Sequence, residues 1–271
     1  MARIGLKTER QERLLRYLQQ HGSITVSELT GLFHCSEATA RRDLEELEQN
    51  GRIIRTMGGG AKYAEPGLSR EIPFLEKQNT RYAEKQAIAS AAAELVQEGD
   101  VVGLTGGTTT FLIARALKRK RRITVVTNAV NIAMELADHE DIQVVLTGGV
   151  LRNKSYELCG PLAEQTVEAL NIHTMFMGID GLTADQGAST YSELEANIAK
   201  LLMKRSDRTI AVFDHTKAGR SSLFRVAALA ELHACISNAP IPDDIRQAME
   251  MQGVNLHVAD AALITNGGTR P

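Results

Sequence analysis

The stretch that decides the fold is Gly22–Ala61, GSITVSELTGLFHCSEATARRDLEELEQNGRIIRTMGGGA. Thr25 is followed three residues later by Glu28, a spacing typical of a capping box that opens a short helix. This helix carries an apolar stripe made of Leu29, Leu32 and Phe33. A tight break at His34 and Cys35 ends it, so the stretch begins as one short helix and a turn.

A second helix follows the break. Ser36 is a suitable N-cap for it, and we expect the helix to run to about Asn50 and to end at Gly51. Behind it, the glycine-rich sequence RIIRTMGGGA is typical of a short β hairpin, or wing. Together these elements predict a winged helix-turn-helix, in which the second helix enters the major groove of double-stranded DNA.

The second helix has two distinct faces. One face is apolar and should pack on the core through Ala40, Leu44 and Leu47. The opposite face projects Ala38 and Arg42, with Thr39 and Arg41 on its flanks. Basic residues lie in the first half of the helix and acidic residues in the second. This polarity suits a helix that contacts DNA through its N-terminal residues.

The role of the two arginines is left open by the sequence, because arginine reads guanine edges or holds phosphates. The competing interpretation is an ordinary surface helix with two solvated arginines, but the capped helices and the wing favour DNA binding. Residues 1–62 carry ten Lys or Arg against eight Asp or Glu, a net charge of +2. So small a charge predicts weak binding by one copy. We therefore expect a homo-oligomer, a dimer or tetramer, with paired DNA-binding domains.

Length and composition set broad limits. A chain of 271 residues suffices for two domains, and 43% hydrophobic and 24% charged residues are typical of a soluble globular protein. No apolar run approaches the ~20 residues of a membrane span, and the N-terminus becomes charged at once. The cysteines are scattered without a CxxC pair, at Cys35, Cys159 and Cys235. We expect a cytoplasmic protein without disulfides, metal or cofactor.

We expect two domains joined by a linker. A first helix from Thr8 to about Gln20, with Thr8 and Gln11 at capping-box spacing, completes a DNA-binding domain over residues 1–62. Residues 63–80 contain two prolines and little periodicity, which is typical of a linker. An effector-binding domain should span residues 81–258, followed by a frayed tail over residues 259–271.

The second domain alternates apolar strands with helices. Strands are expected at Val101–Leu104, Ile123–Val126, Gln143–Leu146, Thr174–Ile179, Thr209–Phe213 and Ala234–Ser237. Helices are expected at Lys85–Gln97, from Thr110, at Glu193–Arg205 and at Asp243–Gln252. This alternation predicts a Rossmann-like α/β domain, a largely parallel sheet with helices on both faces. Ligands on such sheets bind at the carboxyl ends of the strands.

A glycine- and threonine-rich loop follows the first of these strands, with the sequence Thr105, Gly106, Gly107, Thr108 and Thr109. Glycines let backbone N–H groups approach an anion, and the next helix N-terminus and the hydroxyls add further donors. The lysine of the GxxxxGK[ST] nucleotide motif is absent. A plain tight turn is the alternative. It does not require two glycines and three threonines, so we favour a phosphate site.

Three other strand ends carry residues suited to a ligand. Asn128 follows one strand and either caps the next helix or contacts a ligand. Gly149 follows another and allows close approach of the backbone. Lys217 lies in the sequence DHTK after a third strand, where a lysine neutralises a phosphate or is simply solvated.

The helix-turn-helix resembles that of the DeoR family of bacterial transcriptional regulators. The matching residues run from the second helix into the wing: Ser36, Thr39, Arg41, Arg42, Asp43, Leu44, Leu47, Gly51, Arg55, Gly58, Gly59 and Ala61. Ala40, where many relatives carry isoleucine, and an extra glycine, Gly60, depart from the pattern. The resemblance and the helix faces imply DNA contacts from Ser36, Ala38, Thr39, Arg41, Arg42, Arg55 and Gly59.

The second domain resembles the sensor domain of the same family, which is similar to ribose-5-phosphate isomerases. The resemblance lies in VVGLTGGTTTFLIARAL, VVTNA, LTGG, FMGIDGL and IAVFDHTKAG. It implies an effector phosphate held by Thr105, Gly106, Gly107, Thr108, Thr109 and Lys217, in a pocket also lined by Asn128, Gly149 and Asp180. Leu104 and Thr105 stand where many relatives carry Asp-Ser, a departure that concerns the sugar rather than the phosphate.

Catalysis is not expected, because isomerisation needs a carboxylate base and the segment TGGVLRNKS has none where isomerases carry theirs. Asp180, Glu193 and Glu195 are substitutes, although a turn residue and solvated helix charges are the simpler interpretations. The sequence therefore predicts a DNA-binding regulator, a repressor of sugar-metabolism genes that responds to a phosphorylated sugar. The alternatives are an isomerase-like enzyme fused to a DNA-binding domain and an architectural DNA binder without an effector.

Overall fold

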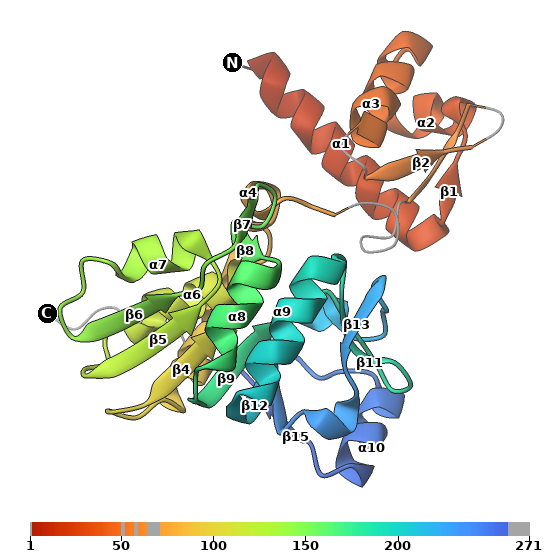
Figure 1. The fold of residues 1–271 in the computed structure, drawn as a ribbon. Helices are drawn as coiled ribbons and strands as arrows, with labels where there is room; N and C mark the ends of the chain where they lie inside the picture. The colour runs from red at the N-terminus through yellow and green to blue at the C-terminus, as the bar shows by residue number, and fades with distance from the viewer. Residues whose placement is uncertain (1, 50–51, 57–58, 64–70, 260–271) are drawn as a thin grey trace, which may run out of the picture. The chain divides into compact units, whose positions relative to one another are not determined.

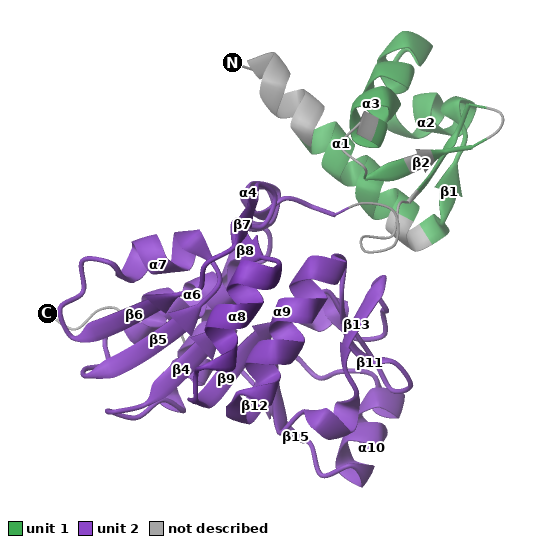
Figure 2. Cartoon of the chain, viewed as in Figure 1, with its two compact units in different colours: residues 1–70 green, residues 71–271 purple. Residues whose placement is uncertain are grey.

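The computed structural model describes residues 2–49, 52–56, 59–63 and 71–259. It divides the chain into two units, residues 1–70 and 71–271 (Figure 1 and Figure 2). Each unit has a hydrophobic core of its own. Residues 71–80, which we expected in the linker, belong to the second unit. Residues 64–70 of the linker and 260–271 of the tail lie outside the described residues.

The first unit, which we call the head, combines three helices with a small sheet. The helices are α1 (Ala2–His21), α2 (Val26–Phe33) and α3 (Glu37–Gln49). The strands are β1 (Ser23–Ile24), β2 (Ile53–Arg55) and β3 (Ala61–Tyr63). They pair antiparallel in the order β1-β3-β2, so β2 and β3 form the predicted wing.

Local caps fix where α2 and α3 begin. The Glu28 N–H donates to Thr25 Oγ1 at 3.2 Å and the Thr25 N–H donates to Glu28 Oε2 at 2.8 Å, which confirms the predicted capping box. His34 ends α2 in the left-handed conformation, with φ of 49°. The Thr39 N–H donates to Ser36 Oγ at 3.2 Å, which confirms Ser36 as the cap of α3.

Two details of the head differ from the sequence prediction. Helix α1 begins at Ala2, so Thr8 lies inside the helix and not at its cap. Leu32 is 48% exposed, because two turns of helix present one face to the core and Leu29 occupies it. The predicted core face of α3 is confirmed, since Ala40, Leu44 and Leu47 are buried. Asn50 and Gly51, where we expected α3 to end, lie outside the described residues.

The second unit, which we call the sensor unit, is built on a seven-stranded parallel sheet in the order β15-β14-β12-β9-β4-β5-β6. Its strands are β4 (Val101–Leu104), β5 (Ile123–Thr127), β6 (Ile142–Leu146), β9 (Ile172–Gly178), β12 (Ser206–Val212), β14 (Ala234–Ser237) and β15 (Asn255–Val258). Each of the six expected strands is found. The Rossmann-like α/β prediction is confirmed.

Helices cover both faces of this sheet. They are α4 (Phe74–Lys77), α5 (Tyr82–Glu94), α6 (Thr108–Leu117), α7 (Val130–Leu136), α8 (Pro161–Glu168), α9 (Glu193–Lys204) and α10 (Asp243–Met251). Side chains of α5, α6 and α7 share one core cluster with Phe176 of β9. Those of α8, α9 and α10 share the other with Met175 and Met177. The alternation along β9 therefore separates the two layers.

Several short elements escaped the sequence analysis. A hairpin is formed by β7 (Val150–Arg152) and β8 (Glu157–Cys159), and a small antiparallel sheet by β10 (Gly181–Thr183), β11 (Gly187–Thr190) and β13 (Phe224–Ala227). Two 3-10 turns complete the unit, η1 (His215–Lys217) and η2 (Leu229–Glu231). These short strands show neither a continuous apolar run nor a sustained alternation, so the sequence gives no pattern from which to predict them.

Candidate functional site

The exposed face of α3 carries the predicted DNA-contacting arginines. Arg42 is exposed and makes no ion pair with any residue that the structure describes. Arg41 is also exposed, and its Nη2 lies 2.6 Å from Glu37 Oε1, a pair whose partners are both about 60% exposed. Water screens such a pair, so it holds Arg41 only weakly. Both guanidinium groups can therefore reach a ligand.

Asp43, next to these arginines, points the other way. Its side chain is buried, and Oδ2 accepts a hydrogen bond from Arg10 Nε of α1 at 2.5 Å. The same bond raises the pKa of Arg10. Since Arg10 and Asp43 are 33 residues apart in the sequence, this pair joins α1 to α3 and fixes the helix that carries Arg42.

The wing is shaped by one glycine and one arginine. A Cβ on Gly60 would lie 2.4 Å from the carbonyl oxygen of Ile24, so β3 reaches β1 only because this residue has no side chain. Arg55 Nη2 donates to the Gly59 carbonyl at 2.9 Å across the turn. Gly60, a departure from the family pattern, thus has a packing role, and Arg55 holds the wing in shape.

All the predicted effector residues lie at one edge of the large sheet. Its strands are parallel, so their carboxyl ends are followed by Thr105–Thr109 (β4), Asn128 (β5), Thr147–Gly149 (β6), Asp180 (β9) and Asp214–Lys217 (β12). From β4 the chain proceeds outward to β5 and β6, and then returns to β9 on the other side of β4. Ligands bind where the strand order reverses in this way. The glycine- and threonine-rich loop and Asp180 lie at this switch point.

The Thr105–Thr109 loop joins β4 to α6. The Gly178 N–H donates to Thr105 Oγ1 at 3.0 Å, which ties the end of β9 to the loop. Gly107 has a φ of 124°, a conformation that favours glycine, and Thr110 Oγ1 donates to its carbonyl at 3.0 Å. No side chain caps α6, so the N–H groups of its first turn are available to an anion.

A buried carboxyl group lies against this loop. A Cβ on Gly106 would come within 2.4 Å of the Glu157 carboxylate, and Glu157 Oε2 accepts from Asn128 Nδ2 at 2.9 Å. Burial, with the charge of Glu195, raises the pKa of Glu157 to about 8. The N-cap of α7 is Ala129, so of the two interpretations left open for Asn128 the helix cap does not hold. Glu157 was missed because its hairpin has no motif.

Gly149 makes a close approach within the chain itself. Its φ is 127°, and a Cβ there would lie 2.7 Å from the carbonyl oxygen of Cys159 in β8. The turn after β6 can therefore pack against the β7–β8 hairpin only with glycine at this position. This contact orients the hairpin that carries Glu157.

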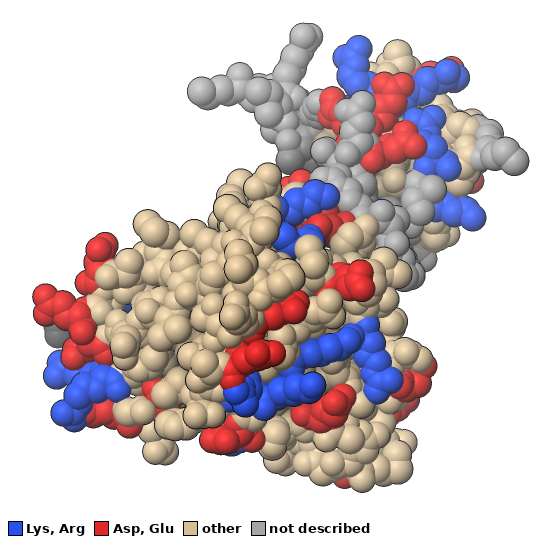
Figure 3. All heavy atoms as spheres, in the orientation of Figure 1, with Lys and Arg blue, Asp and Glu red and all other residues tan. Residues whose placement is uncertain are grey.

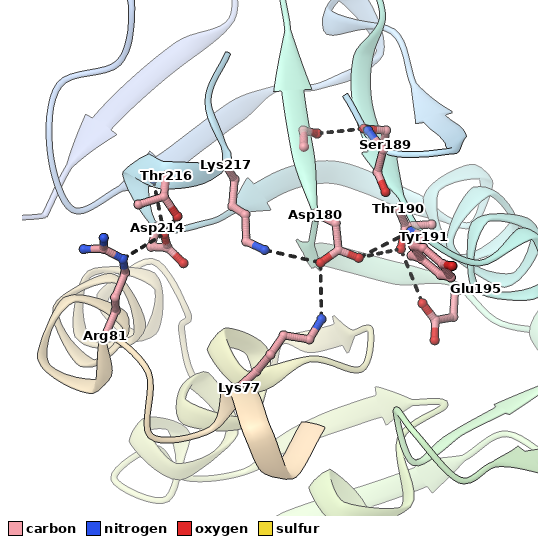
Figure 4. Close-up of polar contacts among 12 residues, drawn as sticks. Lys77, Arg81, Asp180, Ser189, Thr190, Tyr191, Glu195, Asp214, Thr216 and Lys217 are labelled. Atoms are coloured by element: carbon pink, nitrogen blue, oxygen red, sulfur yellow. Dashed lines mark hydrogen bonds and ion pairs between the residues drawn. The ribbon is translucent and has the colours of Figure 1, made fainter. Parts of the chain in front are cut away.

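Asp180 is the centre of an ion cluster (Figure 4). Lys77 Nζ and Lys217 Nζ lie 3.3 Å and 3.4 Å from its Oδ1, while Oδ2 accepts from Thr190 Oγ1 at 3.2 Å and from the Tyr191 N–H at 3.4 Å. Burial favours a higher pKa for Asp180, but the two ammonium groups outweigh it and hold this pKa well below its usual range. Asp180 is thus no simple turn residue, and Lys217 is not freely solvated.

A second ion cluster surrounds Arg152 of β7. Its Nη2 lies 2.7 Å from Glu71 Oε1, its Nε lies 3.3 Å from Glu195 Oε1, and its Nη1 donates to Ser192 Oγ at 2.5 Å. The Glu195 side chain is 12% exposed, and burial raises its pKa. The prediction of Glu195 as a solvated helix charge is therefore wrong. Glu193, two residues earlier on another face of α9, is exposed as predicted.

Residues 10–66 match the model of the DeoR-like helix-turn-helix domain, and residues 80–239 match that of the DeoR C terminal sensor domain. The chain belongs to the DeoR family. It is 35% identical over 251 residues to the HTH-type transcriptional regulator GlpR of Haloferax volcanii, covering 93% of this chain and 97% of that protein. It is 27% identical over 252 residues to the glycerol-3-phosphate regulon repressor of Escherichia coli K12, covering 93% and 99%.

Membership of the DeoR family confirms the prediction that this protein is a DNA-binding transcriptional regulator. The relatives are named as regulators, which agrees with the expectation that it is not an enzyme. The crystal structure of ribose 5 phosphate isomerase A from Neisseria gonorrhoeae is similar to 49% of this chain and 52% of that chain. The identity is 20% and the TM-score 0.37.

Among the residues that the structure describes, no helix is long and apolar enough to cross a membrane. No group of three or more His, Cys, Asp or Glu side chains in the same residues could hold a metal ion. The cysteines, Cys35, Cys159 and Cys235, are free thiols.

Proposed function

We propose that this DeoR-family regulator is a cytoplasmic repressor of sugar-metabolism genes whose sensor unit binds a phosphorylated sugar or sugar derivative. One observation carries the proposal: two ammonium groups converge on Asp180 beside an uncapped helix N-terminus at the switch point of the sheet. Such an arrangement attracts an anion. The name of the Escherichia coli relative, a glycerol-3-phosphate regulon repressor, supports both repression and a phosphorylated effector.

In this proposal the effector phosphate binds the loop of Thr105, Gly106, Gly107, Thr108 and Thr109 together with Lys217. Asn128, Gly149 and Asp180 line the remainder of the pocket. Hydroxyl groups of a sugar would find acceptors in the carboxylate of Asp180 and in Asn128 Oδ1, which is buried without a partner among the described residues. A buried acceptor without a donor favours a ligand that supplies one.

On the head, we propose DNA contacts from Ser36, Ala38, Thr39, Arg41, Arg42, Arg55 and Gly59. Arg42 is the best candidate for reading a base, because it is exposed and no described residue pairs with it. Ser36 and Arg55 also have structural roles: Ser36 caps α3, and Arg55 holds the turn of the wing through its hydrogen bond to the Gly59 carbonyl. Their N–H and guanidinium groups suit phosphate contacts that position the head.

We further propose that the regulator is a homo-oligomer. On one face of the sensor unit, large apolar side chains are exposed: Met134 (70%), Val150 (72%) and Leu162 (64%). Figure 3 shows a broad area without charged side chains over their elements, α7, β7 and α8. Large apolar side chains exposed in an area without charged groups favour a protein interface. Light scattering should therefore detect an oligomer that Val150→Asp dissociates and Leu223→Asp, a change at another exposed apolar residue, leaves intact.

A thermal-shift screen across sugar phosphates tests the effector proposal, because a ligand that binds only the folded state raises its stability. Calorimetry then compares the best phosphate with its unphosphorylated sugar, on the wild type and on Lys217→Ala. Loss of one charge-assisted hydrogen bond should weaken binding by about tenfold to a hundredfold. The effector should also release the wild type from its operator. Equal affinity for the neutral sugar, or for the variant, would reject the site.

A further inference from the structure

The segment that precedes α5 is built into the sensor unit. Glu71 is held by Arg152 of β7 at 2.7 Å, and the Phe74 N–H donates to the Lys154 carbonyl at 2.7 Å. The Phe74 side chain is buried, and its ring centroid lies 5.6 Å from those of Phe111 and Tyr156. Polar contacts and ring packing together fix this segment, and α4 within it, on the edge where the effector residues lie.

Lys77 ends α4 and reaches the effector cluster. Its Nζ lies 3.3 Å from Asp180 Oδ1, the same oxygen atom that Lys217 Nζ approaches to 3.4 Å (Figure 4). Lys77 and Asp180 are 103 residues apart in the sequence. Two ammonium groups thus share one carboxylate oxygen.

A third ammonium group adds to this positive charge. Lys85 of α5 is buried and donates to the Lys77 carbonyl at 2.9 Å. Burial lowers the pKa of Lys85 to about 8, and the charges of Lys217 and Lys77 lower it further against the opposing effect of Asp214. Three ammonium groups therefore lie close together near Asp180 and Asp214, and the charges of Glu71, Glu84 and Glu195 act on them as well. Of the three, Lys77 and Lys217 share a single oxygen of Asp180.

We propose that Lys77 is an effector-binding residue: a phosphate group of the ligand replaces Asp180 as the partner of the Lys77 and Lys217 ammonium groups. This inference rests on the proposed function, since it adds a residue to the same site. The geometry supports it, because Lys77 Nζ and Lys217 Nζ lie 3.3 Å and 3.4 Å from the same oxygen of Asp180, so one anionic group that takes the place of this carboxylate can pair with both. A phosphate has three oxygens to offer, so each lysine gains a full charge-assisted hydrogen bond.

The position of Lys77 in the chain suggests how its contact with the effector could regulate DNA binding. The head ends its last described strand at Tyr63, and the sensor unit begins at Glu71, so α4 is the first helix after the head among the described residues. Lys217, in contrast, lies deep in the sensor sequence. A ligand that changes the partner of Lys77 therefore acts on the segment that leads directly to the DNA-binding head. Binding of the effector would therefore change the contacts of α4.

The experiment uses the full chain and inorganic phosphate, titrated at constant ionic strength against chloride. Thermal shift gives the apparent phosphate affinity of the wild type, Lys77→Gln, Lys217→Gln and Lys118→Gln. Lys118 is a matched control, because its Nζ also pairs with a carboxylate (Glu135 Oε1, 2.6 Å) at similar exposure, outside the site. Lys77→Gln and Lys217→Gln should each weaken binding by about tenfold to a hundredfold, whereas Lys118→Gln should bind as the wild type does.

The outcomes separate this inference from the proposed function. If the wild type does not bind phosphate, or if Lys217→Gln binds it normally, the proposed site fails. If Lys217→Gln loses affinity and Lys77→Gln does not, only the role of Lys77 is overturned. Hydrogen exchange on the wild type provides a test without substitution: phosphate should change the protection of residues 74–78. Unchanged exchange there, at saturating phosphate, would also overturn the inference, even if Lys77→Gln fails to fold.

Discussion

Replacing Gly106 by alanine should destabilise the sensor unit, because the new methyl group has no room. An ideal Cβ on Gly106 would lie 2.3 Å from Glu157 Cγ and 2.4 Å from Cδ and Oε1. Glu157 cannot easily withdraw, since its side chain is buried on β8 and hydrogen-bonded to Asn128 at 2.9 Å. Overpacking of this kind costs about 1–3 kcal/mol. A unit of this size should then melt about 2–12 °C lower.

Gly148→Ala is the matched control in a neighbouring loop. A Cβ there meets its nearest atoms, Leu162 O and Thr166 Oγ1, at 3.7 Å and 3.8 Å, which is ordinary contact. Urea and thermal unfolding of both variants should show a loss for Gly106→Ala and a change within about 0.5 kcal/mol for Gly148→Ala. Combining Gly106→Ala with Glu157→Ala should recover most of the loss. The explanation is refuted if the two substitutions are additive in a double-mutant cycle.

Three further predictions concern side chains on the exposed face of the head, in its interior and beside the effector loop. Arg42→Ala should weaken operator binding by about 1–3 kcal/mol in gel-shift titrations at fixed salt, and unchanged affinity would reject Arg42 as a base contact. Asp43→Asn should destabilise the head by about 1–3 kcal/mol, because a neutral amide replaces the buried negative charge that pairs with Arg10. The exposed Glu45→Gln should be neutral, and equal melting of the two variants would contradict this. The pKa of Glu157 is raised from 4.5 to about 8, so the folded chain holds an extra proton between these values and its stability falls as pH rises through them. Glu157→Gln should reduce this slope by up to ~1.4 kcal/mol per pH unit, and an unaltered slope would show that Glu157 ionises normally.

The sequence determined those features whose physical cause is local. The Thr25–Glu28 capping box and the Ser36 cap are interactions over three residues, so they could be read directly and were found. Six of the seven strands of the parallel sheet were predicted from runs of apolar residues, whereas β15 was missed because its apolar residues alternate with polar ones. A parallel sheet brings all its carboxyl ends to one edge, so the predicted loops lie at that edge. Short elements such as the β7–β8 hairpin were missed, because three residues carry no periodicity.

Tertiary structure alone decided which side chains meet. Strand order puts β9 between β4 and β12, and this order brings Asp180 to Lys217, 37 residues away, while the packing of α4 brings Lys77, 103 residues away. Packing of the β7–β8 hairpin likewise presses Glu157 against Gly106. In the sequence Glu195 looks like a solvated helix charge, but α9 turns it toward Arg152. Periodicity tells which face of a helix or strand is apolar. It does not tell which distant charge that face will meet, because such contacts depend on the order of the strands and not on local sequence.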